Sequence, residues 1–190
     1  MEKDLIPSMG YRYEGIEVTG FKRKLTLDNF KTITNFLNAI KRCKIIIKDF
    51  DPDIVIGCGG YVTAPVIYAA KKLGKKTFIH EQNSVVGLAN KFLARYTDKI
   101  GVSFESTIKD FPKGKAILTG NPCSEKALNI KKTTKEKLDI AKDKKLVLIV
   151  MGSLGSKTIN DKIFSFIDKF RSKNYSVIIV TGNSYYERVK

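Results

Sequence analysis

The segment from Ile54 to Asn90 constrains the fold more than any other part of this sequence. It reads IVIGCGGYVTAPVIYAAKKLGKKTFIHEQNSVVGLAN. An apolar strand over 54–56 runs into a glycine turn, an apolar-periodic helix follows over 62–73, and a second strand follows over 76–79. In an open parallel sheet, ligands bind outside the carboxyl ends of the strands, where glycine lets the backbone approach and the next helix offers unpaired N–H groups. The segment therefore predicts a ligand site at one edge of a parallel sheet.

Four polar residues follow the second predicted strand. They are His80, Glu81, Gln82 and Asn83, and because the carboxyl ends of parallel strands meet at one edge, we expect them beside the glycine turn. His80 is the only histidine in the chain, which makes it a candidate general base. At the end of a buried strand, a hydrogen-bonded structural histidine is the favoured interpretation. We therefore expect hydrogen-bond donors and acceptors to lie together at this edge, and we assign none of them as the group that transfers a proton.

The rest of the first half continues the alternation of strands and helices. The apolar spacing predicts a strand over 11–18, a helix over 27–48 capped by Thr26, a helix over 86–96, and strands over 99–102 and 116–118. Such alternation is typical of an α/β fold with a right-handed, doubly wound parallel sheet.

The character of the sequence changes after Pro122. A lysine-rich, weakly apolar connector leads to a strand over 146–150, a second glycine turn, a helix and a strand over 175–181. The buried stripe expected for this helix is Ile159, Ile163, Phe166, Ile167 and Phe170. Two strand–turn–helix units separated by a polar connector predict two Rossmann-like domains facing one cleft. We expect a first domain over 1–123, a linker over 124–143, and the start of a second domain over 144–190, which is too short to be stable alone.

Composition limits the classes of function. A hydrophobic content of 43% suits a packed interior, no apolar run of this sequence is long enough to span a bilayer, and we expect no secretory signal. Three cysteines in no metal spacing indicate a reduced, cytosolic protein. The net charge of +16 has three open explanations: nucleic acid, an anionic membrane surface, or solvating lysines of a lysine-rich proteome. Because no nucleic-acid-binding motif accompanies the charge, we expect no nucleic acid partner.

Four motifs in order resemble the MurG family of glycosyltransferases. GCGGYVTAP is followed by HEQN with GLANKFLAR, then by TGNP at Thr119–Pro122, and finally by MGSLGSKTIN at Met151–Asn160. The resemblance covers nearly the whole chain and implies a GT-B fold. It implies an enzyme that moves N-acetylglucosamine, with inversion, from its uridine diphosphate to the 4-hydroxyl of lipid-linked muramyl pentapeptide. That reaction belongs to bacterial peptidoglycan synthesis, and thus to cell shape and division, at the cytoplasmic face of the membrane.

The same resemblance assigns roles to residues of this chain. It implies donor-binding roles for Asn83, Gly152, Ser153, Gly155 and Asn160, and acceptor-binding roles for Gly59, Gly60, Tyr61, Thr63, Glu81 and Gln82. N–H groups at helix starts can stabilise the departing diphosphate without a metal, so neither a cofactor nor a metal is expected. The base that the family favours lies in a histidine-bearing, glycine-rich loop that this sequence does not contain. We therefore interpret the chain as an internal or truncated fragment with its catalytic base unassigned.

Three aspartates need a separate interpretation, because a DxD pattern binds a divalent metal in another class of glycosyltransferase. Asp49, Asp51 and Asp53 precede the strand over 54–56, which puts them at the amino end of the sheet, opposite the glycine turn. Their favoured role is a turn, with Pro52 fixing the backbone.

Departures from the family pattern leave other functions open. Relatives place an arginine within two residues of TGNP, where this chain has Cys123 and Ser124; loss of a direct phosphate contact would weaken donor binding by about 1–3 kcal/mol. Tyr185 stands where relatives often carry histidine. The alternatives are a related transferase acting on diacylglycerol, and a basic, non-catalytic remnant that adheres to membranes. Residues 21–25 and the helix over 27–48 have two interpretations: a helix that covers the sheet, or a basic and apolar patch that docks on the inner leaflet.

Overall fold

The computed structural model describes residues 2–18, 28–150, 156–182 and 185–187. It comprises two compact units, Met1–Asn129 and Ile130–Lys190. The predicted boundaries at 123 and 143 remain a prediction. Within the described ranges, no helix is both long and apolar enough to cross a membrane.

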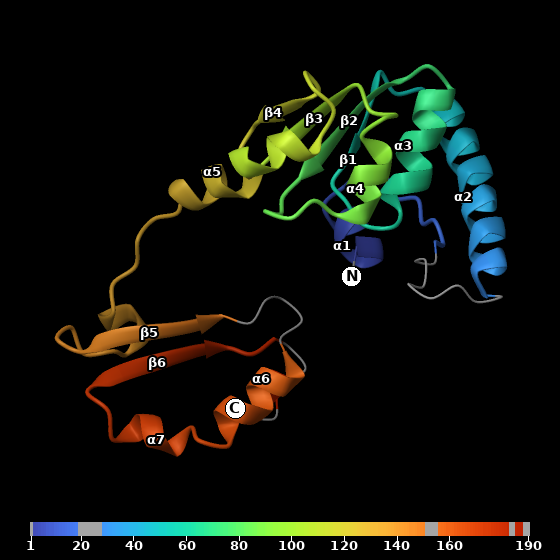
Figure 1. The fold of residues 1–190 in the computed structure, drawn as a ribbon. Helices are drawn as coiled ribbons and strands as arrows, with labels where there is room; N and C mark the ends of the chain where they lie inside the picture. Colours follow the sequence, from blue (N-terminus) through green and yellow to red (C-terminus); the bar gives the residue numbers. More distant parts are fainter. Residues whose placement is uncertain (1, 19–27, 151–155, 183–184, 188–190) are drawn as a thin grey trace. The chain divides into compact units, whose positions relative to one another are not determined.

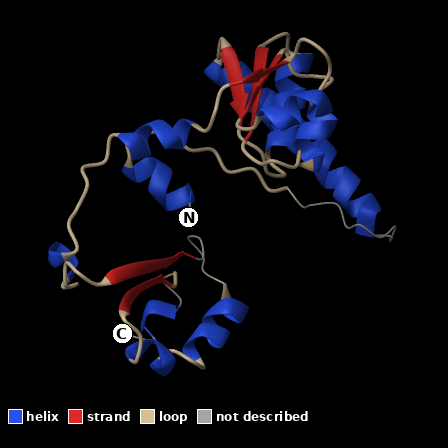
Figure 2. Ribbon diagram, turned by 60° about the vertical axis from the view of Figure 1, so that its left-hand side comes forward, coloured by secondary structure: helices blue, strands red, loops and turns tan. Residues whose placement is uncertain are grey.

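The first unit carries a four-stranded sheet with its helices (Figures 1 and 2). In chain order its elements are α1 (Glu2–Ser8), α2 (Asp28–Phe50), β1 (Ile54–Gly57), α3 (Thr63–Lys72), β2 (Lys76–Glu81), α4 (Leu88–Leu93), β3 (Lys99–Val102), η1 (Glu105–Asp110), β4 (Ala116–Leu118) and α5 (Pro122–Leu128). All four strands are parallel and follow chain order, β1-β2-β3-β4. The predicted α/β class with parallel sheets is confirmed.

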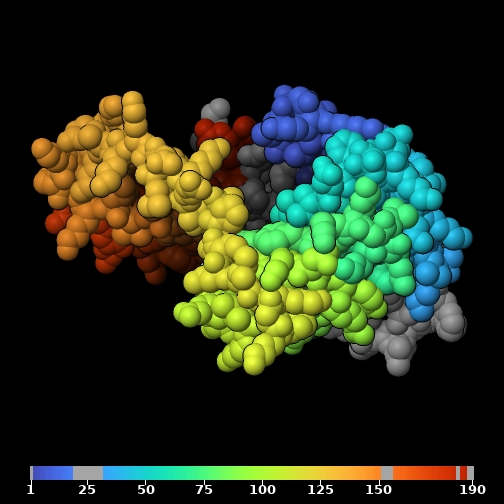
Figure 3. Space-filling view, turned by 90° about the horizontal axis from the view of Figure 1, so that it is seen from above, coloured from blue at the N-terminus to red at the C-terminus, as the bar shows by residue number. Residues whose placement is uncertain are grey.

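Two buried clusters hold the first unit together. One lies between the sheet and the helices α3 and α4 and contains Ile67, Ile79, Val86, Leu93, Ala94, Ile100, Val102 and Phe111. The other joins α2 to α3 through Ile40, Cys43, Ile47, Ala69 and Ala70, and the two helices lie side by side (Figures 1 and 3). The small side chains of Ala69 and Ala70 let the helices approach closely. Helix α3 therefore has two buried faces, and small side chains suit the face that packs on α2.

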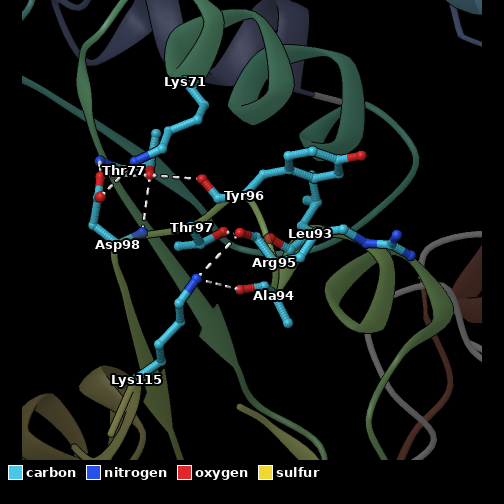
Figure 4. Close-up of polar contacts among 9 residues, drawn as sticks. All are labelled: Lys71, Thr77, Leu93, Ala94, Arg95, Tyr96, Thr97, Asp98 and Lys115. Carbon is cyan, nitrogen blue, oxygen red and sulfur yellow. Dashed lines mark hydrogen bonds and ion pairs between the residues drawn. The ribbon is translucent and has the colours of Figure 1, made fainter. Parts of the chain in front are cut away.

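A polar cluster joins the amino ends of β2 and β3, at the end of the sheet opposite the glycine turn (Figure 4). The Asp98 carboxylate accepts hydrogen bonds from Lys71 at 2.6 Å, from the Thr77 N–H at 2.9 Å and from the Thr77 hydroxyl at 2.9 Å. The bond from Lys71, followed by those from Thr77, lowers the pKa of Asp98 to about 2. Nearby, the Lys115 ammonium donates to the carbonyls of Ala94 and Arg95, just past the last residue of α4.

The second unit is smaller. The elements assigned within its described residues are η2 (Glu136–Leu138), β5 (Lys145–Val150), α6 (Lys157–Phe164), α7 (Asp168–Arg171) and β6 (Tyr175–Val180), and β5 and β6 pair in parallel. The predicted strands over 146–150 and 175–181 are confirmed. The long helix predicted after the glycine turn is broken into α6 and α7, and Ile159 and Phe166 of the expected buried stripe are exposed.

Two other predictions for the first unit are corrected. Residues 11–18 form no strand, because no neighbouring strand pairs with them; Arg12 instead pairs with Glu14 and with Asp49 of α2. Helix α4 begins at Leu88 rather than at 86, because Gly87 adopts an extended conformation and directs its N–H to Glu81. The predicted helix over 27–48 is confirmed as α2, while Thr26 and residues 21–25 lie outside the described residues.

Candidate ligand-binding site

The carboxyl ends of β1 and β2 lie together, as the sequence predicted. Gly57, the last residue of β1, is in register with Ile79, so the glycine turn after β1 lies beside the segment after β2 (Figure 1). Strand β2 is longer than predicted and includes His80 and Glu81. We call the edge formed by residues 57–63 and 80–83 the rim.

The glycine turn of the rim needs its glycines. Gly59 and Gly60 have φ values of +94° and +81°, which residues with a side chain rarely adopt. A Cβ on Gly57 would collide with the Thr63 side chain. Thr63 itself is buried and its hydroxyl donates to the Gly59 carbonyl, so it closes the turn where α3 begins.

Gln82 connects the two halves of the rim. Its side-chain amide nitrogen donates to the carbonyl of Cys58 at 3.2 Å, which ties the segment after β2 to the turn after β1. Tyr61 is 64% exposed, and Gly60 has open space where a Cβ would stand. Among the residues predicted to bind the acceptor, Gly59, Gly60, Tyr61 and Gln82 are thus brought together at one surface, with Thr63 beneath them.

His80 connects the rim to the segment after β4. It is buried, and its Nε2 lies 3.0 Å from the carbonyl oxygen of Gly120. The burial and the hydrogen bond that the sequence favoured for His80 are both present; its structural role stays a prediction. The ring passes over Gly101, where a Cβ would lie 2.6 Å from Phe78 Cζ, 2.9 Å from Thr119 Oγ1 and 3.2 Å from His80 Cδ2. Sequence reasoning missed Gly101, because nothing in the pattern of β3 shows that two side chains of β2 flank it.

Glu81 lies beneath the rim. It is 1% exposed, and its carboxylate accepts four hydrogen bonds. Oε1 accepts from the N–H of Asn83 at 3.0 Å and from its side-chain amide at 2.9 Å. Oε2 accepts from the Gly87 N–H at 2.9 Å and from the Asn90 side-chain amide at 3.0 Å. Burial alone would raise the pKa of Glu81, but the bonds from Gly87, Asn83 and Asn90 together outweigh it and lower that pKa.

Of the four polar residues predicted to cluster, His80 and Glu81 are buried, whereas Gln82 and Asn83 are exposed. The backbone and side chain of Asn83 both bond to Glu81, so it stands at the surface in a fixed conformation. Asn90 was not singled out from the sequence. It is buried on α4 and donates to Glu81 and to the carbonyl of His80 at 3.3 Å; its position inside the GLANKFLAR motif was the available signal.

The second predicted site lies mostly outside the described residues. Gly152, Ser153 and Gly155 belong to that undescribed segment. Asn160 is fully buried on α6, where its side-chain amide donates to the carbonyl of Thr181 at 3.1 Å. It therefore joins α6 to the end of β6.

Two of the three aspartates before β1 form ion pairs. Asp49 accepts from Arg12 at 3.0 Å, and Asp51 pairs with Lys75. Asp51 also has a φ of 48°, which suits the turn predicted there. Past TGNP, Cys123 and Ser124 are exposed at the start of α5, where the Asn121 side chain accepts the Cys123 N–H at 3.0 Å.

Comparison with known proteins places this geometry in context. Residues 1–102 match the family model described as glycosyltransferase family 28 N-terminal domain. A Bacillus cereus protein named UDP-N-acetylglucosamine–N-acetylmuramyl-(pentapeptide) pyrophosphoryl-undecaprenol N-acetylglucosamine transferase 1 is 45% identical over all 190 residues, which make up 52% of its length. A Halalkalibacterium halodurans protein of the corresponding name is 46% identical over 100% of this chain and 53% of its own length. The chain thus spans about half the length of the curated relatives it matches.

Solved structures agree. The crystal structure of Acinetobacter baumannii MurG superposes with a TM-score of 0.64 at 26% identity, covering 99% of this chain and 51% of that one. A UDP-GlcNAc 2-epimerase from Neisseria meningitidis, solved with UDP-GlcNAc bound, superposes with a TM-score of 0.56 at 17% identity over 87% of this chain and 51% of that one. The second likeness concerns the fold alone. The resemblance to the MurG family seen in the motifs is confirmed.

Proposed function

This chain belongs to glycosyltransferase family 28, and we propose that it forms part of an enzyme that transfers N-acetylglucosamine from UDP-N-acetylglucosamine to undecaprenyl-linked muramyl pentapeptide. The observation that carries the proposal is the match of the whole chain, at 45% identity, to a relative named for that reaction. The rim supports it, because an exposed glycine turn and an exposed asparagine lie together where an α/β sheet binds its ligand.

The chemistry assigns different tasks to the two parts of the rim. In an inverting transfer, the acceptor hydroxyl attacks the anomeric carbon, its proton leaves to a base, and uridine diphosphate departs. The rim binds and orients in this scheme: the turn after β1 offers backbone N–H groups at the start of α3, which favour an anionic diphosphate, and Asn83 offers hydrogen bonds to a sugar. We assign no base, since His80 is held by Gly120.

Donor binding completes the proposal. Gly152, Ser153, Gly155 and Asn160 would hold the uridine diphosphate. Because preorganised N–H groups can stabilise the departing diphosphate, the transfer needs neither a metal nor another cofactor.

We also propose peripheral binding at the cytoplasmic face of an anionic membrane. Helix α2 supports it with an exposed stripe in which Ile33 and Leu37 are followed by Lys41 and Lys48. Apolar side chains with lysines on the same face are typical of helices that lie on anionic bilayers. Co-sedimentation with vesicles tests this: binding should require anionic lipid and weaken with salt, and equal binding to neutral vesicles would contradict it.

A transfer assay tests the proposed reaction. The protein as its gene encodes it is mixed with radiolabelled UDP-N-acetylglucosamine and a water-soluble analogue of the lipid-linked muramyl pentapeptide. Formation of a labelled disaccharide product is expected. Transfer to diacylglycerol instead would identify the glycolipid alternative, and absence of transfer to either acceptor, with donor binding lost as well, would favour a non-catalytic role.

A further inference from the structure

The four residues of the HEQN segment, His80 to Asn83, make different contacts in the structure. His80 bonds to Gly120 and Gln82 bonds to Cys58, so each holds a neighbouring segment of the protein. Glu81 is buried and contacts its own turn and α4. Asn83 is exposed. A ligand at this edge would therefore meet Asn83 and Gln82, which is exposed as well. Glu81 is the member of the segment that bonds to Asn83 and determines where it stands.

Glu81 holds Asn83 at two points. One carboxylate oxygen, Oε1, accepts from both the backbone and the side chain of Asn83, which closes a small ring and restricts the side-chain torsion angles. The other oxygen is engaged by Gly87 and Asn90, so the carboxylate cannot rotate away. All four partners are donors, and only an ionised carboxylate accepts from all four.

The ionised carboxylate also decides how the Asn83 amide is oriented. An amide oxygen turned toward Oε1 would face another acceptor, whereas the amide nitrogen donates to it at 2.9 Å. The nitrogen is therefore turned inward, and Oδ1 is the atom left to accept a hydrogen bond from a ligand. Hydroxyl and acetamido groups of an amino sugar are donors of the matching kind.

We propose that Glu81 is a positioning residue that fixes Asn83 with its amide oxygen toward the sugar nucleotide. The proposal rests on the proposed function and adds a role for a residue that was predicted to contact the acceptor itself. Glu81 acts through Asn83 and the turn to Gly87 without touching a substrate.

A double-mutant cycle in the protein as its gene encodes it tests the proposal. Glu81→Gln keeps the size of the side chain but replaces one acceptor oxygen with an NH2 group, which cannot accept the hydrogen bonds made there. We expect kcat/KM for UDP-N-acetylglucosamine to fall about 10- to 100-fold. Asn83→Ala should lower it by a similar factor. If Glu81 acts through Asn83, Glu81→Gln should cost less than about 3-fold in the Asn83→Ala background. Losses that multiply would overturn the proposal.

A control and a second readout separate positioning from general instability. Ser84→Ala changes an exposed residue of the same turn and should leave kcat/KM unchanged. Hydrogen exchange of the Asn83 side-chain amide, measured by NMR, requires no substrate. Exchange of this amide should be slow in the wild type and fast in Glu81→Gln. Equal exchange rates in the two proteins would reject the proposal, whether or not transfer is found. If the exchange rates differ but no transfer is found, only the proposed function is rejected.

Discussion

Each of the two units pairs parallel strands with helices, but the units are stabilised very differently. In the first unit, two hydrophobic clusters bury both faces of α3. The residues of the rim are joined by hydrogen bonds that involve His80, Gln82 and Glu81. Among the described residues of the second unit, the buried side chains are Ile140, Asn160, Ile163, Thr181 and Tyr185.

This difference shows what a preorganised site requires. In the first unit the ligand-facing residue, Asn83, is held by a buried carboxylate that is itself held by α4. In the second unit, Asn160 ties α6 to β6, and Tyr185 donates from its hydroxyl to Asp161 at 2.7 Å. With so few buried side chains, the second unit has less apolar burial to oppose the entropy of ordering it.

The largest expected effect compares the two interiors. Ile79→Ala removes a fully buried side chain of β2 and should lower the free energy of unfolding of the first unit by about 2–5 kcal/mol. Ile163→Ala in the second unit should cost no more than about 2 kcal/mol, since exposed neighbours can collapse into the space. Hydrogen exchange resolved by peptide measures the stability of both units in one sample. Equal losses in the free energy of unfolding would contradict the difference between the two interiors.

The next effect concerns the packing around Gly101, beside the His80 ring. Gly101→Ala would place a Cβ 2.6 Å from Phe78 and 2.9 Å from Thr119, so we expect a loss of about 1–3 kcal/mol from overpacking. Gly15→Ala is the matched control, because its Cβ would make only ordinary contacts, 3.6 Å from the Tyr13 ring. Thermal unfolding compares the two variants. If they unfold at the same temperature, the surroundings of Gly101 are not tightly packed and the prediction is wrong.

A smaller effect depends on pH. The pKa of Asp98 is lowered from 3.8 to about 2, so its stabilising contribution is complete above the unfolded value and is lost as pH falls through the folded one. Because Asp98 and Lys71 are partly exposed, we expect a contribution of about 1 kcal/mol after screening. Denaturant titrations of wild type and Asp98→Asn should differ by this amount near neutral pH and converge as the pH falls below about 2. A constant difference would contradict the assignment.

The sequence predicted the site better where the signal is local. Strands β1 to β4 were found from their apolar runs, and His80 was placed because it follows a buried strand. The strand predicted from the alternation over residues 11–18 was wrong, because a strand also needs a neighbouring strand to pair with. Arg12 pairs with Asp49 of α2 instead. The burial of Glu81 could not be predicted, since its donors come from Asn83, Gly87 and Asn90, which a turn brings together.

The kinetics of sugar transfer by Asn83→Ala and Ser84→Ala variants test the central claim most directly. Both residues are exposed on the same turn, but only Asn83 is fixed by the Glu81 carboxylate. The account predicts that Asn83→Ala loses at least about 10-fold in kcat/KM for UDP-N-acetylglucosamine while Ser84→Ala keeps the wild-type value. Equal activity of the two variants would contradict it.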